Sequence, residues 1–395
     1  MLPLSGLRVL AVEQYGAGPY GTMQLADLGA EVIKIENPAD GGDMARRVGP
    51  YFLGADDSHF FESFNRNKKS ITLDLQREGA REVLHALVGG ADAVLDNLRG
   101  DLPAKLGLTY AALKGANPRI VCAHLSAYGR SGARASWPGY DYLMQAEAGY
   151  LSLTGEPGGP PSRMGLSIVD MMTGLFAAFG LLAGVIAARQ TGSGRDIDVS
   201  LFDCALQNLS YLATWYLNEG YEQGRAPRSG HPSLTPSQLY RTRDGHIFIM
   251  CNKAKFWPIL CDLIGRPELA ADADFATFEA RLANRDRLTA VLDAALGLRT
   301  TDDWLARFAG RIPAAPVHDL AAALNSPFVT EAGRIWAMAH PQRAAFKMVG
   351  APFTCPGEAL PRKVAPALGR DTDAVLGSCG ISPARIADLR RQRVV

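Results

Sequence analysis

Short apolar runs alternate with longer helical segments through the first 200 residues of the chain. The apolar runs that resemble buried strands occupy residues 7–12, 31–36, 70–75, 91–96, 119–125 and 196–200. Segments with apolar residues at helical spacing, such as 79–88, lie between them. Strands that alternate with helices are typical of βαβ units. The pattern therefore predicts an α/β fold with a mostly parallel sheet.

The alternation stops at residues 219–237, which are rich in Gly, Pro, Ser and Arg. Such a stretch marks a domain boundary, and a chain of 395 residues exceeds the usual size of one hydrophobic core. A hairpin strand at 246–251 and helices rich in alanine and leucine follow. We expect residues 1–218 to form the first part of a large domain, 219–328 a smaller α+β domain, and 329–395 a C-terminal segment.

Residues 171–188 carry no charge, and a run of about 18 residues is near the lower limit for a membrane span. Gly174, Gly180 and Gly184 within it allow other backbones to come close. Arg189 and the glycine-containing stretch 191–194 then end the segment as a helix of a soluble protein ends. We expect a buried helix and no membrane partner.

Composition gives no sign of a nucleic-acid partner, because the formal net charge is +1 and the basic residues are scattered. The six cysteines have neither C-x-x-C pairs nor the spacing of metal ligands, which predicts free thiols, a cytoplasmic location and no metal site. The N-terminus lacks the features of an export signal. The cysteines are Cys122, Cys204, Cys251, Cys261, Cys355 and Cys379.

Residues 16–21, GAGPYG, spell the G-x-G-x-x-G fingerprint of dinucleotide-binding folds, and Glu36 ends a second strand twenty residues after Gly16. In that fingerprint the first glycine turns the chain directly off the strand. Here residues 13–15 intervene and move the glycines roughly 10 Å along an extended chain. We therefore expect no NAD or FAD site, with an oxidoreductase as a rival interpretation.

Six sequence blocks resemble CoA-transferase family III, the CaiB/BaiF family that includes formyl-CoA transferase and α-methylacyl-CoA racemase. They follow the order of the family along most of the chain: QYGAGP at 14–19, LGAEVIKIE at 28–36, NRNKKSI at 65–71, GLSIVD at 165–170, TGSGR at 191–195 and APALGRDT at 365–372. The resemblance implies a Rossmann-like CoA-binding domain to which the last segment returns, and an interlocked homodimer. It implies a transferase that moves CoA between carboxylic acids.

Asp170 lies where the extended run 165–169 meets the apolar helix. Aspartate is a preferred N-cap, and the helix dipole favours its ionised form at neutral pH, so position alone fits a structural cap. The resemblance implies that Asp170 is the nucleophile. Its carboxylate would attack a thioester to give a mixed anhydride and a free CoA thiolate, which then forms an aspartyl-CoA intermediate.

Asp141 follows Tyr140 in the sequence GYDY at 139–142. The resemblance implies that Asp141 assists catalysis, since a second carboxylate can orient the first or shift its pKa. The structural alternative is an exposed residue at a helix start. Racemases of the family carry histidine at the position of Tyr140, because racemisation takes a base on each face of the α carbon. A tyrosine is a poor base at neutral pH, so transfer is favoured; a racemase and a non-catalytic acyl-CoA-binding protein remain alternatives.

CoA is implied as a cosubstrate, with no tightly bound cofactor. The residues that the resemblance places around it are Gln14, Ala17, Leu73, Asn97, Leu98 and Lys105. Two positions depart from the family pattern: Asn37 replaces a basic residue, and Gly100-Asp101 replaces a Pro-Gly pair. Arg99 or Arg77 either supplies the missing positive charge or is an ordinary surface residue.

Two further segments are candidates for the substrate side of the site. Gly230 and His231 match the short form of a glycine-containing loop that covers the active site in relatives, although any loop between domains would look similar. Arg163 lies seven residues before Asp170, where it could hold the distal carboxylate of a small dicarboxylic acid such as a succinate-like acid. A solvated loop arginine is the alternative.

Overall fold

The structure, a computed structural model, describes residues 1–395. It divides into two compact units. The first unit comprises Met1–Ala148, Met164–Ser210 and Ala332–Val395, and the second comprises Gly149–Arg163 and Tyr211–Glu331. The chain therefore leaves the first unit twice, once for a short excursion and once for the main part of the second unit.

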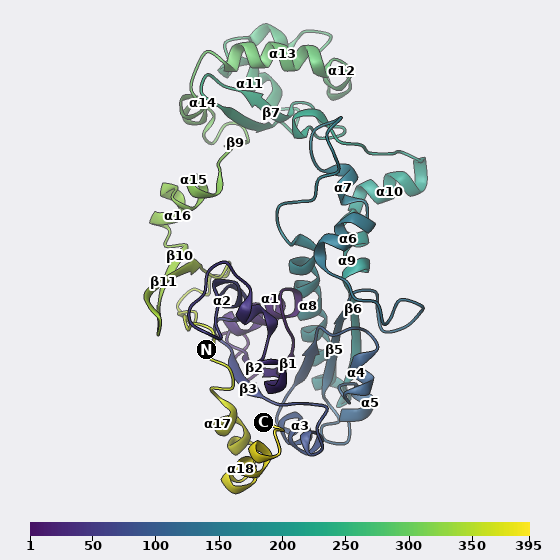
Figure 1. Ribbon diagram of the computed structural model, residues 1–395. Helices are drawn as coiled ribbons and strands as arrows, with labels where there is room; N and C mark the ends of the chain where they lie inside the picture. The colour runs from purple at the N-terminus through teal and green to yellow at the C-terminus, as the bar shows by residue number, and fades with distance from the viewer. The chain divides into compact units, whose positions relative to one another are not determined.

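Six parallel strands form the central sheet of the first unit, in the order β3-β2-β1-β4-β5-β6 (Figure 1). They are β1 (Arg8–Val12), β2 (Glu31–Glu36), β3 (Lys69–Thr72), β4 (Ala93–Asp96), β5 (Val121–Ser126) and β6 (Arg195–Ser200). Leu10 of β1 pairs with Ile33 of β2 and with Val94 of β4. The predicted α/β fold with a mostly parallel sheet is confirmed.

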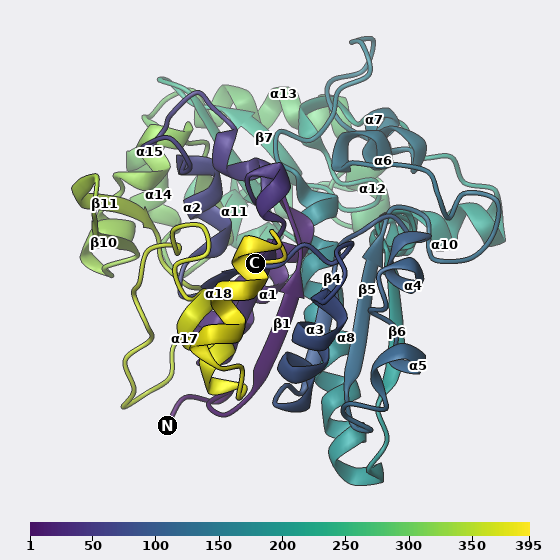
Figure 2. The ribbon, with the colours of Figure 1, turned by 60° about the horizontal axis from the view of Figure 1, so that its bottom comes forward.

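Helices cover both faces of this sheet. On one face, Leu10, Ile33 and Val94 share a hydrophobic core with α3 (Ala80–Gly89), α17 (Thr372–Ser378) and α18 (Pro383–Arg391) (Figure 2). On the other face, α8 (Ile168–Thr191) packs against β5 and β6, and α1 (Ala17–Asp27) packs against α8. The contact is close because Gly184 of α8 has no side chain: a Cβ there would lie 2.8 Å from Val121.

The C-terminal segment joins the first unit along the edge strand β3. The N–H of Asp371 donates to the carbonyl of Ser70, and the N–H of Ser70 donates to Asp371 Oδ2, each at 2.9 Å. The N–H of Asn67 donates to the carbonyl of Lys363 at 3.0 Å. These bonds place residues from the two ends of the chain side by side.

The remaining elements of the first unit are short. They are the 3₁₀ helices η1 (Pro38–Asp40) and η2 (Met44–Arg47), α2 (His59–Asn65), α4 (Leu102–Lys105), α5 (Tyr110–Leu113), α6 (Asp141–Glu147), α9 (Leu201–Asn208), β10 (Ile335–His340) and β11 (Arg343–Val349). The last two strands pair as an antiparallel hairpin.

The second unit combines a three-stranded antiparallel sheet with helices. Its strands are β7 (Ser237–Arg241), β8 (His246–Met250) and β9 (Ala314–Pro316). Its helices are α7 (Tyr150–Leu153), α10 (Ser210–Glu219), η3 (Pro227–Ser229), α11 (Phe256–Leu263), η4 (Pro267–Ala270), α12 (Phe278–Ala283), α13 (Arg285–Leu296), α14 (Thr301–Phe308), α15 (Leu320–Leu324) and α16 (Pro327–Glu331). Helix α10 begins at Ser210, the last residue of the first unit.

The apolar stretch 201–217 is divided into two helices, α9 and α10, at Ser210, whose φ of 51° lies in the left-handed region. The expectation that residues 171–188 form a buried helix needs correction. Helix α8 is only partly buried, since Phe179 is 72% exposed and Ile186 58% exposed. By length and composition alone, α8 could cross a membrane. All six cysteines are free, as predicted.

Candidate active site

The turn between β1 and α1 replaces the tight glycine turn of a dinucleotide-binding fold. Strand β1 ends at Val12 and α1 begins at Ala17. Between them, Tyr15 has a φ of 68°, which a residue with a side chain rarely adopts. The inserted residues therefore form a reversing turn of their own, and sequence analysis recognised the insertion but not the role of Tyr15.

Each of the three glycines in this motif faces another protein segment. A Cβ at Gly16 would lie 2.8 Å from Asp170 Oδ2, and one at Gly18 would lie 3.0 Å from Asn97 Cβ. A Cβ at Gly21 would lie 2.2 Å from the carbonyl oxygen of Gly174, so α1 and α8 cross at backbone contact. The glycines serve the approach of α8 and of the β4 end, which is a different use from cradling a pyrophosphate.

Asp170 lies in the first turn of α8, two residues after the helix begins at Ile168. Its N–H donates to Asp141 Oδ2 at 3.0 Å, so Asp141 satisfies the helix end and Asp170 is not the N-cap. Asp170 is only 7% exposed. Burial and then the nearby charge of Asp141 raise the pKa of Asp170 to about 7. The expectation that the helix start favours an ionised carboxylate is therefore not met, because burial opposes the charge.

Gln145 of α6 holds Asp141 and the chain that approaches Asp170. Its Nε2 donates to Asp141 Oδ1 at 2.5 Å and to the carbonyl of Leu166 at 3.1 Å, while its Oε1 accepts the N–H of Met164 at 2.9 Å. Gln145 is fully buried. Sequence analysis missed it, although its place one helical turn after Asp141 puts both residues on one face of a helix.

A cavity of about 390 Å³ opens beside Asp170. Its lining includes the predicted residues Gln14, Ala17, Asn97, Leu98 and Tyr140, together with Tyr15, Gly16 and Arg99. The ring of Tyr15 meets that of Tyr140 edge-on at 6.2 Å between centroids. The cavity lies where β1, β4 and β5 end, the edge at which α/β sheets bind ligands.

A second cavity of about 320 Å³ adjoins the first, and Gln14, Met44, Leu98 and Leu102 line both. Its own lining includes Leu73, Asn37 and Arg47. Lys105 lines neither cavity, and its Nζ pairs with Asp101 at 2.7 Å. Arg77 is also absent from both linings. The positive charge nearest to this pair of cavities therefore comes from Arg47 and Arg99.

Asn97 fixes the backbone of Gln14 by a reciprocal pair of hydrogen bonds. The N–H of Gln14 donates to Asn97 Oδ1 at 2.8 Å, and Asn97 Nδ2 donates to the carbonyl of Gln14 at 2.7 Å. The side chain of Gln14 is left to line both cavities. This bridge joins the turn after β1 to the end of β4, its neighbour in the sheet.

The remaining predicted residues belong to the second unit. Arg163 ends its first segment, and Gly230 and His231 follow η3. His231 Nδ1 accepts the N–H of Ser233 at 3.2 Å, and burial lowers the pKa of the His231 ring. Their roles as substrate and lid residues stay predictions.

One group of side chains has the composition of a metal site. The ligand atoms of Asp57, Glu62 and His340 lie within 4.8 Å of one another. However, His340 Nδ1 accepts the N–H of Gln342 at 3.1 Å, and His340 Nε2 lies at hydrogen-bond distance from Asp57 Oδ2, 3.0 Å away. Both ring nitrogens of His340 are therefore engaged by protein partners, so the contacts describe a hydrogen-bonded group.

Comparison with known proteins gives a consistent result. The sequence model of CoA-transferase family III matches residues 4–372. An acetyl-CoA:oxalate CoA-transferase of Acetobacter aceti is 39% identical, over 82% of this chain and 83% of that protein. A succinate–glutarate CoA-transferase of Agrobacterium fabrum is 32% identical, over 84% of each. The crystal structure of a CaiB/BaiF family protein from Brucella suis aligns with a TM-score of 0.81 and 34% identity, covering 96% of this chain and 99% of that one.

Proposed function

The chain belongs to CoA-transferase family III, and we propose that it moves CoA from an acyl-CoA donor to a free carboxylic acid through covalent intermediates on Asp170. The observation that carries the proposal is the environment of this carboxylate. Asp170 is 7% exposed, has a pKa raised to about 7, and lies beside the cavity of about 390 Å³. A raised pKa makes the ionised carboxylate more basic and so a better nucleophile.

The reaction needs no reagent besides the two substrates. Asp170 attacks the thioester carbonyl, a C–O bond forms, the C–S bond breaks, and the product is a mixed anhydride with a free CoA thiolate. The thiolate then attacks the side-chain carbonyl of Asp170 and releases the donor acid, which leaves aspartyl-CoA. An acceptor carboxylate attacks that thioester, and the returning thiolate takes the new acyl group and restores Asp170.

The start of α1 supports the charge that develops in these steps. Gly16 precedes the helix and lies against Asp170 Oδ2. The first N–H groups of a helix have no partner within it, and they carry the positive end of the helix dipole. Backbone donors at this position stabilise an oxyanion formed on the anhydride or thioester carbonyl.

The two cavities accommodate the two ends of acyl-CoA. We assign the thioester end to the cavity beside Asp170 and the nucleotide end to the cavity lined by Leu73, Leu98 and Arg47. Leucine side chains offer apolar walls for adenine, and arginine offers a cation for phosphate. Gln14 lines both cavities and so contacts the part of CoA that connects them.

A small dicarboxylic acid is the acceptor class that we propose. Both relatives described above are named for dicarboxylates, oxalate in one case and succinate and glutarate in the other. Arg163 is the residue that we assign to the distal carboxylate, and Gly230 and His231 form the lid. We further propose a cytoplasmic homodimer, interlocked as the family resemblance implies, in which the exposed Phe176, Phe179 and Ile186 of α8 are covered.

An acceptor labelled with heavy oxygen in its carboxylate tests the proposal. When labelled acid attacks aspartyl-CoA and the thiolate then takes the acyl group, one heavy oxygen is left on Asp170. Mass spectrometry of peptides after a single turnover should therefore find one added heavy oxygen at Asp170 and none at Asp141, and repeated turnover should add a second at Asp170. Transfer without label on Asp170 would contradict the covalent route, and no transfer across a panel of acyl-CoA donors and acids would favour a binding protein.

A further inference from the structure

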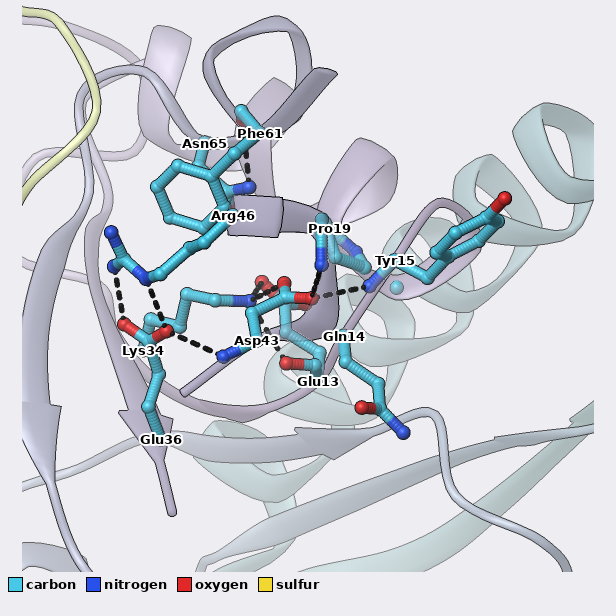
Figure 3. A network of polar contacts seen from close by, with 12 residues as sticks. Glu13, Gln14, Tyr15, Pro19, Lys34, Glu36, Asp43, Arg46, Phe61 and Asn65 are labelled. Atoms are coloured by element: carbon cyan, nitrogen blue, oxygen red, sulfur yellow. Dashed lines mark hydrogen bonds and ion pairs between the residues drawn. The ribbon is translucent and has the colours of Figure 1, made fainter. Parts of the chain in front are cut away.

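A group of buried charged side chains contacts the turn at residues 13–16, whose last residue, Gly16, faces Asp170. The side chains of Glu13, Lys34, Asp43 and Lys68 are each 0% exposed. Glu13 follows β1, Lys34 belongs to β2, Asp43 precedes η2, and Lys68 precedes β3. Figure 3 shows Lys34 and Asp43 converging on the backbone at Glu13 and Tyr15. The chain thus brings four charges from four segments to one point.

Lys34 and Asp43 together hold both sides of the turn. Lys34 Nζ donates to the carbonyl of Glu13 at 2.8 Å and pairs with Asp43 Oδ2 at 2.8 Å. Asp43 Oδ1 accepts the N–H of Tyr15 at 3.0 Å and that of Ala45 at 2.9 Å. A continuous series of polar contacts therefore connects the carbonyl of Glu13, through the Lys34–Asp43 ion pair, to the N–H of Tyr15.

Lys68 secures the carboxylate of Glu13 and the first turn of α1. Its Nζ donates to Glu13 Oε1 at 2.7 Å, to the carbonyl of Pro19 at 2.9 Å and to Asn65 Oδ1 at 3.0 Å. An ammonium group has three donors, so all of them are used. The turn is thus held at its start by Glu13 and at its end by Pro19.

Stability alone does not account for this group. Burying charges costs several kcal/mol for each ion, and replacing a buried ion pair by apolar residues of similar volume is often neutral or stabilising. Three of the contacts end on backbone groups between Glu13 and Pro19, namely the carbonyl of Glu13, the N–H of Tyr15 and the carbonyl of Pro19. That backbone includes Tyr15, whose left-handed conformation persists only where surrounding contacts determine it.

We propose that Lys34 and Asp43 are positioning residues of the transfer reaction, which fix the turn at residues 13–16 so that Gly16 stays against the nucleophilic oxygen of Asp170. The inference rests on the proposed function. The ion pair makes no contact with Asp170, and Asp43 lines the second cavity but not the reaction cavity. The ion pair acts on Asp170 through Tyr15 and Gly16, which line the reaction cavity.

Loss of the ion pair has a specific chemical consequence. A turn that moves away from Asp170 admits water to the carboxylate, so the burial that raises its pKa is reduced. Two titratable groups face Asp170, namely Asp141 and Tyr15. The charge of Asp141 raises the pKa of Asp170. The pKa of Tyr15 is itself raised, first by burial and then by the charge of Asp170. A displaced turn therefore moves the acidic limb of the rate profile to lower pH while it lowers the maximal rate.

The test compares two pairs of substitutions that each remove one buried ion pair. The first is Lys34→Met with Asp43→Asn. The second is Arg66→Met with Asp27→Asn, which removes a pair of 2.6 Å with side chains 5% and 0% exposed. Asp27 is the last residue of α1 and Gly16 precedes its first, so the control pair lies at the other end of the helix.

The variant Lys34→Met/Asp43→Asn should lower kcat at least about tenfold, because a displacement of about 1 Å can cost about a hundredfold. It should move the acidic limb of the pH profile down, with KM for acyl-CoA changed less than about threefold. The control pair should leave the limb unmoved. Equal losses of kcat in both pairs, or an unmoved limb in the first, would overturn the inference.

If the double variant does not fold, the single variant Asp43→Asn provides the test, because asparagine preserves the shape of the side chain and keeps one acceptor oxygen. It should show the same downward movement of the limb at a smaller loss of kcat; a limb like that of the wild type would again overturn the inference. Wild-type protein that transfers no CoA would instead refute the proposed function. The two failures are therefore distinguishable.

Discussion

Gly16 lies so close to Asp170 that a methyl group added at Gly16 would come within 2.8 Å of Asp170 Oδ2. Gly16 immediately precedes α1 and Asp170 lies in the first turn of α8, and the crossing of these two helices is fixed by the backbone contact of Gly21 with Gly174. The nucleophile thus has no side chain on one flank. Asp170 meets the start of a helix there, which is the arrangement that the proposed chemistry uses.

Gly16→Ala should lower kcat about tenfold or more while the fold persists. The methyl group meets the mobile end of the Asp170 side chain, which can rotate away, so the cost falls on the placement of the nucleophile. Steady-state kinetics and thermal unfolding would measure the two effects. Gly89→Ala, where nothing lies within 4 Å of the added carbon, is the control. An alanine variant at Gly16 with unchanged kcat would show that the open flank is not needed.

Asp170→Asn should abolish transfer and stabilise the fold at alkaline pH. With its pKa raised from 3.8 to about 7, folded Asp170 keeps a proton that the unfolded chain has lost. Wild-type stability therefore falls as pH rises through this window, and the variant lacks that fall. Urea unfolding should show a gain of up to about 4 kcal/mol near pH 8 and almost none near pH 4.

The exposed Asp302 offers a matched control for that measurement. Asp302→Asn removes a solvent-exposed carboxylate and should give no comparable gain near pH 8. A variant at Asp170 that is less stable than the wild type near pH 8 would contradict the assignment of a buried, destabilised carboxylate.

Asp141→Asn should shift the acidic limb of kcat/KM to lower pH. The charge of Asp141 raises the pKa of Asp170, so its removal lowers that pKa and leaves more of the nucleophile ionised in acid. Asparagine retains one acceptor oxygen for the N–H of Asp170. A full pH profile of both proteins is the measurement. A limb that moves to higher pH would assign the effect to lost structure.

Local patterns made part of this structure predictable. Buried parallel strands are short, continuous apolar runs, which is why residues 7–12 and 31–36 indicated β1 and β2. The insertion before Gly16 likewise argued correctly against a standard dinucleotide turn, because it depends only on chain length between neighbours. Strand ends differed by a few residues, since an apolar run continues into the loop that follows it.

The contacts that make the site were not predictable from local patterns. Lys34 and Lys68 are charged residues that a sequence analysis places at the solvent-exposed surface, yet the side chains of both are fully buried against partners from distant segments. Asp170 has the letter of an N-cap, but Asp141 supplies that cap from α6. Burial and capping of this kind depend on which segments of the chain contact one another in the folded protein. The identity of a charged residue alone does not indicate which partner it will have.

The cofactor preference follows from how the three glycines are used. Because Gly16, Gly18 and Gly21 face Asp170, Asn97 and Gly174, we propose that the start of α1 serves the nucleophile and not the pyrophosphate of a dinucleotide. CoA should therefore raise the melting temperature of the protein, whereas NADH and FAD at equal concentration should not. A larger shift with either dinucleotide than with CoA would contradict this use of the motif.

The acceptor class gives the last prediction. If Arg163 binds the distal carboxylate of a dicarboxylic acid, Arg163→Met removes a charge-assisted hydrogen bond that a monocarboxylic acid never makes. KM for succinate-like acceptors should then rise about tenfold, which corresponds to roughly 1.4 kcal/mol of lost binding. KM for acyl-CoA and for a monocarboxylate of similar length should change little. Arg225→Met is the matched control, since Arg225 donates to the carbonyls of Gly159 and Leu151 within the same unit. An equal rise in KM for monocarboxylic and dicarboxylic acids would remove Arg163 from the acceptor site, because the effect would then not depend on the second carboxylate. A similar rise in KM in the Arg225→Met control would do the same, because the effect would then not be specific to Arg163.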